Sequence, residues 1–467
     1  MRMNENFEDR DEVLATVRRF EHMVAHNEPV FFDLADFENI IDHYTSNTQY
    51  EKALQACEAA IALYPFSTEL LIDRSQVLAM KGEYGAASTQ IEDVAQLDPD
   101  NPDVAVTRGI IATQKGEFAE AVAFFHQAAE RAQDRDDIFF NLGLAYQSWQ
   151  KFKSAAKFYK QSLRLNPDND VAVQELLYCL EVSERLEKNL EFFRRFTDDD
   201  PYSAVAWYNL GQAYYRAGKL DDAISAFEYA LLIDAKFHEA HGFLASVYVS
   251  QERYRAAISE FELSYPEGQP TPEALCNIGE CHEKLAEWDL ARRFYQRSID
   301  LDPEMDEAWF GIGIVMNVQE KYFEAIHFFR KAVSLYEESV EYWLALAAAE
   351  YQIGNVVSSI EAYEKAVEVA PDNKDAWLNW SIILYEQGNF DGAIDLMRNA
   401  VEIQPLEAEL HYRLCAYLLA GGRYREAYQC LENALVLDFD KHRLLFDYFP
   451  ELESQKALAR LIDQYRK

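Results

Sequence analysis

A fixed spacing of prolines constrains the fold of this chain more than any other feature of its sequence. Seven prolines differ in residue number by multiples of 34. They are Pro65, Pro99, Pro167, Pro201, Pro303, Pro371 and Pro405. One period of this length is the signature of an array in which each unit packs on its neighbours. When this proline is placed at position 32, twelve repeats without insertion fill residues 34–441.

Other positions of the repeat follow the same phase. Position 20 is alanine in ten of twelve repeats, and Asn189 and Ser359 are the exceptions. Position 8 is mostly small, with Ser75, Gly109, Gly143, Gly211, Ala245, Gly279, Gly313, Ala347, Ser381 and Cys415. Position 24 is mostly aromatic, with Phe125, Tyr159, Phe193, Phe227, Phe261, Tyr295, Phe329 and Tyr363. Small residues at positions 8 and 20 predict two helices in close approach, and the aromatic rings are expected to fill the space between units.

Turn-forming residues divide each repeat into two helices. Position 15 is glycine in six repeats, at Gly82, Gly116, Gly218, Gly354, Gly388 and Gly422. Glycine adopts a left-handed turn conformation readily. The proline at position 32 cannot continue a helix interior. Each repeat is therefore predicted to be a helix, a turn and a second helix.

These positions carry a resemblance to a known family. Residues 206–236 read AWYNLGQAYYRAGKLDDAISAFEYALLIDAK, which contains W-x2-L-G-x2-Y followed by Ala, an aromatic residue and the corner. The pattern resembles the tetratricopeptide repeat (TPR), and in particular long bacterial-type scaffold arrays. The resemblance implies an all-α, right-handed α-solenoid of about twelve helix pairs. It also implies a concave groove lined by the first helices, and binding of proteins rather than catalysis.

The two ends of the chain are expected to cap this array. Residues 1–33 contain an acidic segment and an amphipathic helix over 9–27, and residues 442–467 contain the C-terminal capping helices. The last helix has an apolar face of Leu458, Leu461, Ile462 and Tyr465. Arrays need such caps because an end repeat otherwise exposes apolar surface. Since caps and repeats use nearly the whole chain, the sequence predicts that the protein is not an enzyme.

The charge of the chain limits its partners. Acidic residues number 81 and basic residues 44, which gives a net charge of −37. This argues against nucleic-acid binding and against adhesion to an anionic membrane. The N-terminus lacks a secretory signal, no apolar run is long enough to span a membrane, and the six cysteines are scattered. A cytoplasmic protein with reduced thiols and without membrane insertion is therefore expected.

Motifs for metals and catalysis are weak. Cys276, Cys281 and His282 do not share one helical face, and His22 and His26 lack a third ligand. The HEAH sequence at residues 238–241 has the wrong spacing for a zinc protease. Neither a metal nor a cofactor is predicted.

Candidate partner-binding residues follow from the groove that the resemblance implies. Positions 5, 6, 9 and 12 of the first helices should face it. The candidates are Asn141, Tyr208, Asn209, Gln212, Tyr215, Asn277, Tyr351, Asn379, Tyr385 and Tyr412. An asparagine amide both donates and accepts, so a row of asparagines can pair with a peptide backbone of any sequence. The alternatives are that asparagine is simply common at this position and that the tyrosines are partly buried.

Position 2 is acidic in nine of the twelve repeats. These residues are Glu69, Asp103, Asp137, Glu239, Glu273, Glu307, Glu341, Asp375 and Glu409. They support two readings. An acidic rim could select a basic partner, or carboxylates in a first helical turn could simply stabilise the helix dipole.

Two segments depart from the general pattern. The fifth repeat, residues 170–203, has the bulky Leu177 at position 8, Asn189 at position 20 and Phe196 at position 27. It is either a hinge or a degenerate but packed repeat. Residues 151–164 (KFKSAAKFYKQSLR) carry five basic residues and no acidic one. That stretch either docks an acidic partner or is a solvated helix face.

The function predicted from the sequence is a scaffold that binds a protein or an extended peptide in the groove. The alternative is a non-catalytic targeting or regulatory subunit of an enzyme or an assembly complex.

Overall fold

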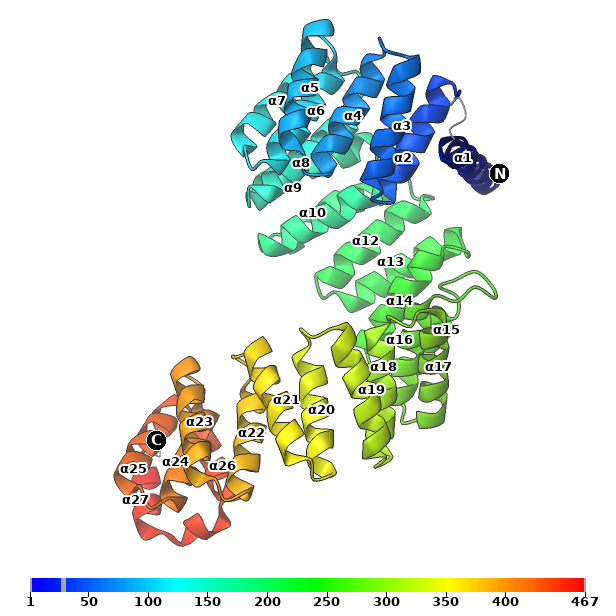
Figure 1. The fold of residues 1–467 in the computed structure, drawn as a ribbon. Coiled ribbons are helices and arrows are strands. Elements are labelled where there is room, and N and C mark those ends of the chain that lie inside the picture. Colours follow the sequence, from blue (N-terminus) through cyan, green and yellow to red (C-terminus); the bar gives the residue numbers. More distant parts are fainter. Residues whose placement is uncertain (1, 27–30, 466–467) are drawn as a thin grey trace. The chain divides into compact units, whose positions relative to one another are not determined.

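The computed structural model describes residues 2–26 and 31–465, and within them the chain is all-α. It contains 27 α-helices and three short 3-10 helices in this range, without a β-strand. The chain divides into two compact bodies, an N-terminal body of Met1–Ala235 and a C-terminal body of Lys236–Lys467. Figure 1 shows the helices following one another as antiparallel pairs within each body.

The first helices of the twelve repeats start at position 1 without exception, and each is 13 residues long. In the N-terminal body they are α2 (Leu34–Ser46), α4 (Thr68–Met80), α6 (Pro102–Gln114), α8 (Asp136–Ser148), α10 (Asp170–Val182) and α12 (Ala204–Arg216). In the C-terminal body they are α14 (His238–Ser250), α16 (Pro272–Lys284), α18 (Asp306–Val318), α20 (Val340–Gln352), α22 (Lys374–Glu386) and α24 (Ala408–Ala420).

Eleven of the second helices start at position 17. In the N-terminal body these are α3 (Tyr50–Leu63), α5 (Tyr84–Leu97), α7 (Phe118–Arg131), α9 (Phe152–Leu165) and α13 (Leu220–Ile233). In the C-terminal body they are α15 (Tyr254–Phe261), α17 (Trp288–Leu301), α19 (Tyr322–Leu335), α21 (Val356–Val369), α23 (Phe390–Ile403) and α25 (Tyr424–Leu437). The predicted 34-residue phase is thus visible in the helix boundaries.

Side chains at the last position of the preceding repeat cap most of the first helices. The Ser203 hydroxyl accepts a hydrogen bond from the Ala206 amide, and the Asn373 side chain accepts one from Ala376. Asp33, Ser67, Asn101, Asn169, Thr271, Ser339 and Glu407 cap their helices in the same way. Such caps satisfy amides that have no partner within the helix, and they fix where it begins.

The turn between the two helices is left-handed in every repeat. Position 15 has a positive φ in all twelve, although only six of these residues are glycine. The other six are Thr48, Gln150, Glu184, Glu252, Ala286 and Glu320, with φ between 54° and 60°. The turn therefore belongs to the repeat itself, and the glycines mark only where it is least strained.

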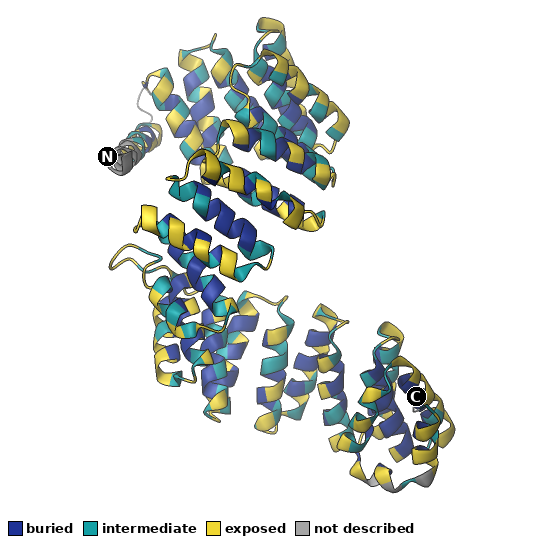
Figure 2. Ribbon diagram, turned by 180° about the vertical axis from the view of Figure 1, so that it is seen from behind, coloured by how far each residue is buried: buried dark blue, intermediate teal, exposed yellow. Residues whose placement is uncertain are grey.

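Within a repeat, the ring at position 24 lies against the backbone at position 8. A methyl group on Gly211 would stand 2.6 Å from the nearest carbon of the Phe227 ring, and one on Gly279 would stand 2.8 Å from the ring of Tyr295. The ring of Tyr295 also packs on Gly311 of the next repeat. The aromatic residues therefore fill space within a repeat as well as between repeats. Figure 2 shows the buried residues on the sides of the helices that face each other.

In four repeats a tryptophan at position 4 bonds the first helix to the corner before it. The indole Nε1 of Trp207 donates to the Pro201 carbonyl at 2.9 Å, and that of Trp377 donates to the Pro371 carbonyl at 2.9 Å. Trp309 and Trp343 make the equivalent bonds. Trp377 is buried and the other three are half-buried, and in each case the hydrogen bond joins the corner to the first helix.

The N-terminal helix packs on the first repeat. α1 (Arg2–Ala25) starts earlier than predicted, and residue 27 of the predicted helix lies outside the described residues. Its Phe20 is buried, with ring centroids 6.5 Å from Phe37 and 6.3 Å from Tyr44.

The C-terminal segment packs on the last repeat through α26 (Leu444–Tyr448) and α27 (Lys456–Tyr465). Leu458 and Ile462 of α27 are buried, and Leu461 and Tyr465 are partly buried against the same core. The last two residues of the predicted helix, 466–467, lie outside the described residues.

Two repeats depart from this regular pattern. In the fifth, a 3-10 helix (Glu187–Asn189) replaces the first turn of the second helix, so α11 (Leu190–Asp199) starts late. Here α10 packs mainly on α9 and α11 mainly on α12, as expected if bulky residues separate the pair. In the seventh, α15 ends at Phe261, shortly before Pro266, because proline cannot continue a helix.

Candidate protein-interaction surface

The predicted asparagines occupy different environments on the first helices. Asn277 on α16 and Asn379 on α22 are exposed, whereas Asn141 on α8 is half-buried. The Asn141 amide donates to the Asp137 carbonyl of its own helix at 2.9 Å. Asn277 and Asn379 stand three repeats apart, with Gly311 between them at the same position. The structure therefore brings no two of these asparagines onto adjacent helices of one body.

Asn209 and Gln212 on α12 are buried rather than exposed. Gln212 accepts a hydrogen bond from Gln174 of α10, and Arg216 donates to that same Gln174 at 2.8 Å. Arg216 also donates to Glu181 at 3.0 Å, so this polar network joins two successive first helices. Within the described residues, the Asn209 Oδ1 and the Gln212 Nε2 are buried without a hydrogen-bond partner.

The predicted tyrosines also divide by burial. Tyr215 and Tyr351 are half-buried, and the Tyr351 hydroxyl donates to Glu386. Tyr208 is 7% exposed, with its ring centroid 6.0 Å from that of Phe227. Tyr208 thus packs in the repeat rather than lying open on the surface.

Two tyrosines near the C-terminus belong to the packing of the last repeats. Tyr412 is fully buried, and its hydroxyl donates to the Asp438 carbonyl at 2.8 Å, so it is not a surface residue. Tyr385 stacks on Tyr417 at 4.9 Å and meets the edge of Phe449 at 5.1 Å. The sequence pattern placed these residues on the correct helices but did not reveal that the C-terminal segment contributes to their burial.

Successive first helices of the N-terminal body carry a group of carboxylates, which we call the acidic face. It consists of Glu38 and Asp42 on α2, Glu69 and Asp73 on α4, and Asp103 on α6. Burial, and after it the charges of the neighbouring carboxylates, together raise the pKa of Asp73 to about 7. Burial, followed by Glu69 and Asp42, likewise raises the pKa of Glu38. These carboxylates repel one another, so a cation placed among them would be bound favourably.

The C-terminal body has a comparable set of carboxylates on α16, α18 and α20. Burial raises the pKa of Glu307, and Asp306 and Glu273 add to that rise. Burial also raises the pKa of Glu283, partly offset by the hydrogen bond that the Tyr295 hydroxyl donates to it at 2.9 Å. Each body therefore has its own acidic first-helix surface.

The sequence interpretation missed most of the acidic face. It considered acidic residues only at position 2, where an acidic rim and helix-dipole stabilisation are alternative readings. Glu38, Asp42 and Asp73 lie at positions 5, 9 and 6 instead, away from the first helical turn. Acidic residues at these groove-facing positions of successive repeats are the sequence signal from which the acidic face could have been predicted.

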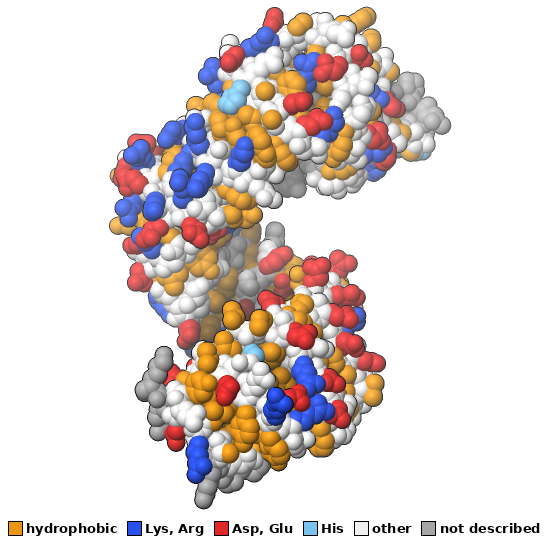
Figure 3. Space-filling view, turned by 90° about the vertical axis from the view of Figure 1, so that its left-hand side faces the viewer, with side chains coloured by type: hydrophobic (Ala, Val, Ile, Leu, Met, Phe, Trp, Pro, Cys, Tyr) orange, Lys and Arg blue, Asp and Glu red, His pale blue; other side chains and the backbone are white. Residues whose placement is uncertain are grey.

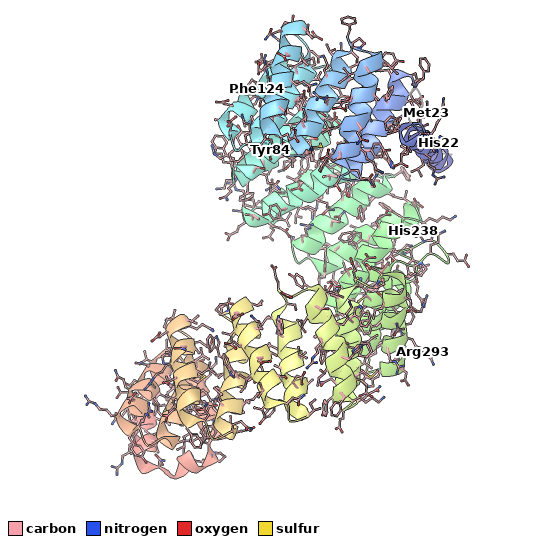
Figure 4. The ribbon with its side chains drawn as sticks, viewed as in Figure 1. His22, Met23, Tyr84, Phe124, His238 and Arg293 are labelled. Carbon is pink, nitrogen blue, oxygen red and sulfur yellow. The ribbon has the colours of Figure 1, made fainter. Side chains whose placement is uncertain are left out.

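Histidines and cysteines near the weak metal motifs have other partners. The His282 ring pairs with Glu287 at 2.7 Å and the His241 ring with Glu260 at 2.6 Å. His22, labelled in Figure 4, stacks on His26 with centroids 4.2 Å apart. Across the described residues, no group of three or more potential ligands is suitably placed for a metal ion.

All six cysteines are free thiols, and five of them are buried. Burial raises the pKa of Cys57 and of Cys281 to about 12, as expected of packed rather than reactive thiols. A search of the described helices finds none with the length and apolar character that crossing a membrane requires.

Comparison with solved structures finds likeness to other helical repeat proteins. The crystal structure of YrrB, titled a TPR protein with an unusual peptide-binding site, is 22% identical with a TM-score of 0.33. That match covers 39% of this chain and 95% of YrrB. The Cut9–Hcn1 hetero-tetramer structure of the APC/C is 14% identical with a TM-score of 0.40, covering 87% of this chain and 99% of that chain.

Comparison of sequences gives both a relative and a family. "Protein CTR9 homolog" from Arabidopsis thaliana is 25% identical over 138 residues. The match spans 29% of this chain and only 12% of the length of that relative. Family profiles described as the tetratricopeptide repeat match residues 40–102, 72–138, 137–169, 204–237, 272–305, 318–374, 344–408 and 384–443. The chain belongs to the tetratricopeptide repeat family.

Proposed function

We propose that this protein is an interaction scaffold whose first helices bind an extended, basic segment of a partner protein. The acidic face of α2, α4 and α6 is the observation that carries this proposal. The other four carboxylates of this face, on three successive first helices, are held close enough to oppose the ionisation of Asp73. A lysine or arginine side chain of a partner, placed among these carboxylates, offsets their mutual repulsion. This electrostatic attraction favours binding of a basic segment.

An extended partner suits the spacing of these helices. Neighbouring helices pack with their axes about 8–10 Å apart, and an extended chain advances about 3.3–3.6 Å per residue. Basic side chains about three residues apart would therefore meet successive helices. Contacts repeated along an array also explain how a specific complex can form without a deep pocket.

The exposed and half-buried residues predicted from the sequence form the second part of the proposal. The exposed side chains of Asn277 and Asn379 would hydrogen-bond the backbone of a partner. The Asn141 amide already donates one hydrogen bond to its own helix, and its remaining groups would bind the partner in the same way. Tyr215, Tyr351 and Tyr385 add aromatic surface of the kind that binding sites use. The partial exposure of these three tyrosines supports this role, although Tyr385 also packs on Tyr417 and Phe449. The burial of Tyr208, Asn209, Gln212 and Tyr412 argues that those four stabilise the fold instead.

The test uses the full chain and a fluorescent peptide in which lysine alternates with glycine and serine. The triple variant Glu38→Gln, Asp42→Asn, Asp73→Asn removes three charges from the acidic face. We expect it to bind the peptide roughly tenfold more weakly by fluorescence anisotropy, because each ion pair adds a modest part of the affinity. Raising the salt concentration should reduce this difference.

A matched variant removes the same number of charges elsewhere. Glu58, Asp93 and Glu130 are exposed on the second helices α3, α5 and α7. The variant Glu58→Gln, Asp93→Asn, Glu130→Gln should bind as the parent does. Equal weakening by both variants would show that net charge alone attracts the peptide, and it would refute a specific face.

A further inference from the structure

A stripe of cations runs along the second helix of the fourth repeat, against the charge of the chain as a whole. Lys153, Lys157, Lys160 and Arg164 stand three or four residues apart on α9. Residues at this spacing share one face of an α-helix. The stripe covers the 12 residues 153–164 and is about 16 Å long at the helical rise. Figure 3 shows Lys and Arg side chains gathered on this part of the N-terminal body.

These four cations line a pocket that the fifth repeat completes. The pocket has a volume of about 270 Å³, and Arg185, Ser183 and Asn189 of the fifth repeat form its other side. A second hollow of about 490 Å³ shares Lys153 and Ser183 with it and continues toward Lys151. Together they make an elongated depression between α9 and the turn that comes after α10.

The irregular start of α11 creates this depression. In other repeats the second helix starts at position 17, but here a 3-10 helix takes the place of that first turn. Asn189, where ten other repeats have alanine, accepts a hydrogen bond from the Lys160 ammonium group. The departure from the repeat pattern therefore positions a lysine rather than merely loosening the packing.

In the part of the chain that the structure describes, the cations of the pocket have no carboxylate partners. Within the described residues, neither the four cations of the stripe nor Arg185 forms an ion pair with Asp or Glu. Two nearby glutamates pair with cations outside the pocket: Glu181 with Arg216 at 3.0 Å, and Glu187 with Lys219 at 3.6 Å. A third, the exposed Glu184, lines the second hollow at the end near Lys151. Burial, with Arg164 close by, also lowers the pKa of Lys160. An anion in the pocket would reverse that effect.

We propose that this depression is a second docking site, which binds an extended acidic segment of a partner protein. Its length favours a polypeptide over a single small anion, since a stripe of about 16 Å matches about five extended residues. The net charge of −37 repels a nucleic acid, which carries a charge on every nucleotide, more strongly than a short acidic peptide. The site lies on a second helix and is independent of the acidic face on the first helices.

The test uses the full chain and a fluorescent peptide of about ten residues in which glutamate alternates with serine, long enough to span the stripe. Lys153, Lys157 and Arg164 are exposed, so replacing all three by glutamine should leave the fold intact. We expect this variant to bind the peptide at least roughly tenfold more weakly than the parent protein. Thermal melting of both proteins checks that the fold is unchanged.

A matched control removes three exposed arginines from α17, namely Arg292, Arg293 and Arg297. Arg293 projects outward from that helix in Figure 4. Replacing them by glutamine changes the net charge equally and should preserve binding. The triple variant of the acidic face should also bind the acidic peptide as the parent does. The two proposals can therefore fail independently, because each is tested with its own peptide and its own variant.

Three results would overturn the inference. The first is unchanged binding by the α9 variant, and the second is equal loss in the α17 control. The third is tighter binding of a single-stranded oligonucleotide than of the peptide, with the oligonucleotide binding lost in the α9 variant. If the parent self-associates in sedimentation and the α9 variant does not, while neither binds the peptide, the stripe contacts a second copy of this chain instead.

Discussion

The ring of Phe125 lies so close to the backbone of Gly109 that a methyl group on that glycine would stand 2.7 Å from the ring. The two residues are 16 apart, on α6 and α7 of one repeat. Real side-chain carbons do not approach each other this closely, so the ring must move if the glycine gains a side chain. The same relation joins Gly211 with Phe227 and Gly313 with Phe329. It explains why position 8 is small in the other repeats that have a large ring at position 24, whereas in the fifth repeat, with Leu177 opposite Phe193, the two helices pack mainly on their neighbours.

Replacing Gly109 by alanine should destabilise the N-terminal body by about 1–3 kcal/mol through overpacking. Urea unfolding followed by circular dichroism measures the loss. Gly85 on α5 is the control, because nothing lies within 4 Å of an added methyl group there. The change Gly85→Ala should stabilise slightly, since alanine favours helix. Loss of stability in both variants would argue against the packing explanation.

The shared left-handed turn predicts opposite effects at two equivalent positions. Ala286 has a φ of 58°, whereas Gly354 occupies the same position in a later repeat with a φ of 81°. Ala286→Gly should stabilise the C-terminal body by about 0.5–1 kcal/mol, and Gly354→Ala should destabilise it by a similar amount. An added methyl group at Gly354 meets no atom within 4 Å, so only backbone strain acts there. Thermal melting of the two variants should move in opposite directions.

The sequence predicts the positions of the helices well because the repeat encodes them locally. Alanine at position 20 and a small residue at position 8 each occur in ten of the twelve repeats and indicate the same close packing of the two helices. The left-handed turn could only be found in part, because Thr48, Ala286 and Glu320 adopt it without being glycine. The pairing of the repeats imposes the turn on these residues whatever their own preference.

Burial at the candidate surface is less predictable from the repeat. Tyr412 and Tyr215 both lie on first helices, yet the first is fully buried and the second only half-buried. Arg413, next to Tyr412, lies beneath Tyr448 of α26, whose ring centroid is 3.6 Å from the guanidinium carbon. Because α26 lies outside the repeats, the consensus positions of a repeat cannot predict this contact.

The pKa of Asp73 predicts a pH-dependent stability. Its folded-state pKa of about 7 exceeds the unfolded value, so the folded protein binds this proton more tightly. The resulting stability is present below about pH 4 and is lost as the pH rises through about 7. Asp73→Asn should therefore stabilise the protein by about 1–2 kcal/mol at pH 8, after allowing for solvent screening. The gain should disappear near pH 4.

Melting temperatures at both pH values check this expectation. Asp93→Asn is the matched control, because Asp93 is exposed on α5. It should change the melting temperature little at either pH. A gain for Asp73→Asn that is equal at pH 4 and pH 8 would assign the effect to packing rather than to charge.

The turn before α11 should be the most rapidly exchanging part of the N-terminal body apart from its ends. Residues 184–190 contain a left-handed Glu184 and a 3-10 helix, whereas the equivalent residues 218–224 lead directly into the α-helix at Leu220. Amides in a short 3-10 segment open more easily, so their hydrogen exchange should be roughly tenfold faster than at residues 218–224. Mass spectrometry of exchanged peptides measures this ratio.

Fast exchange across all of residues 170–203 would mean that the repeat opens as a whole and acts as a hinge. Exchange confined to the turn, and slowed by an acidic peptide, would mean that the same irregularity serves the basic pocket instead.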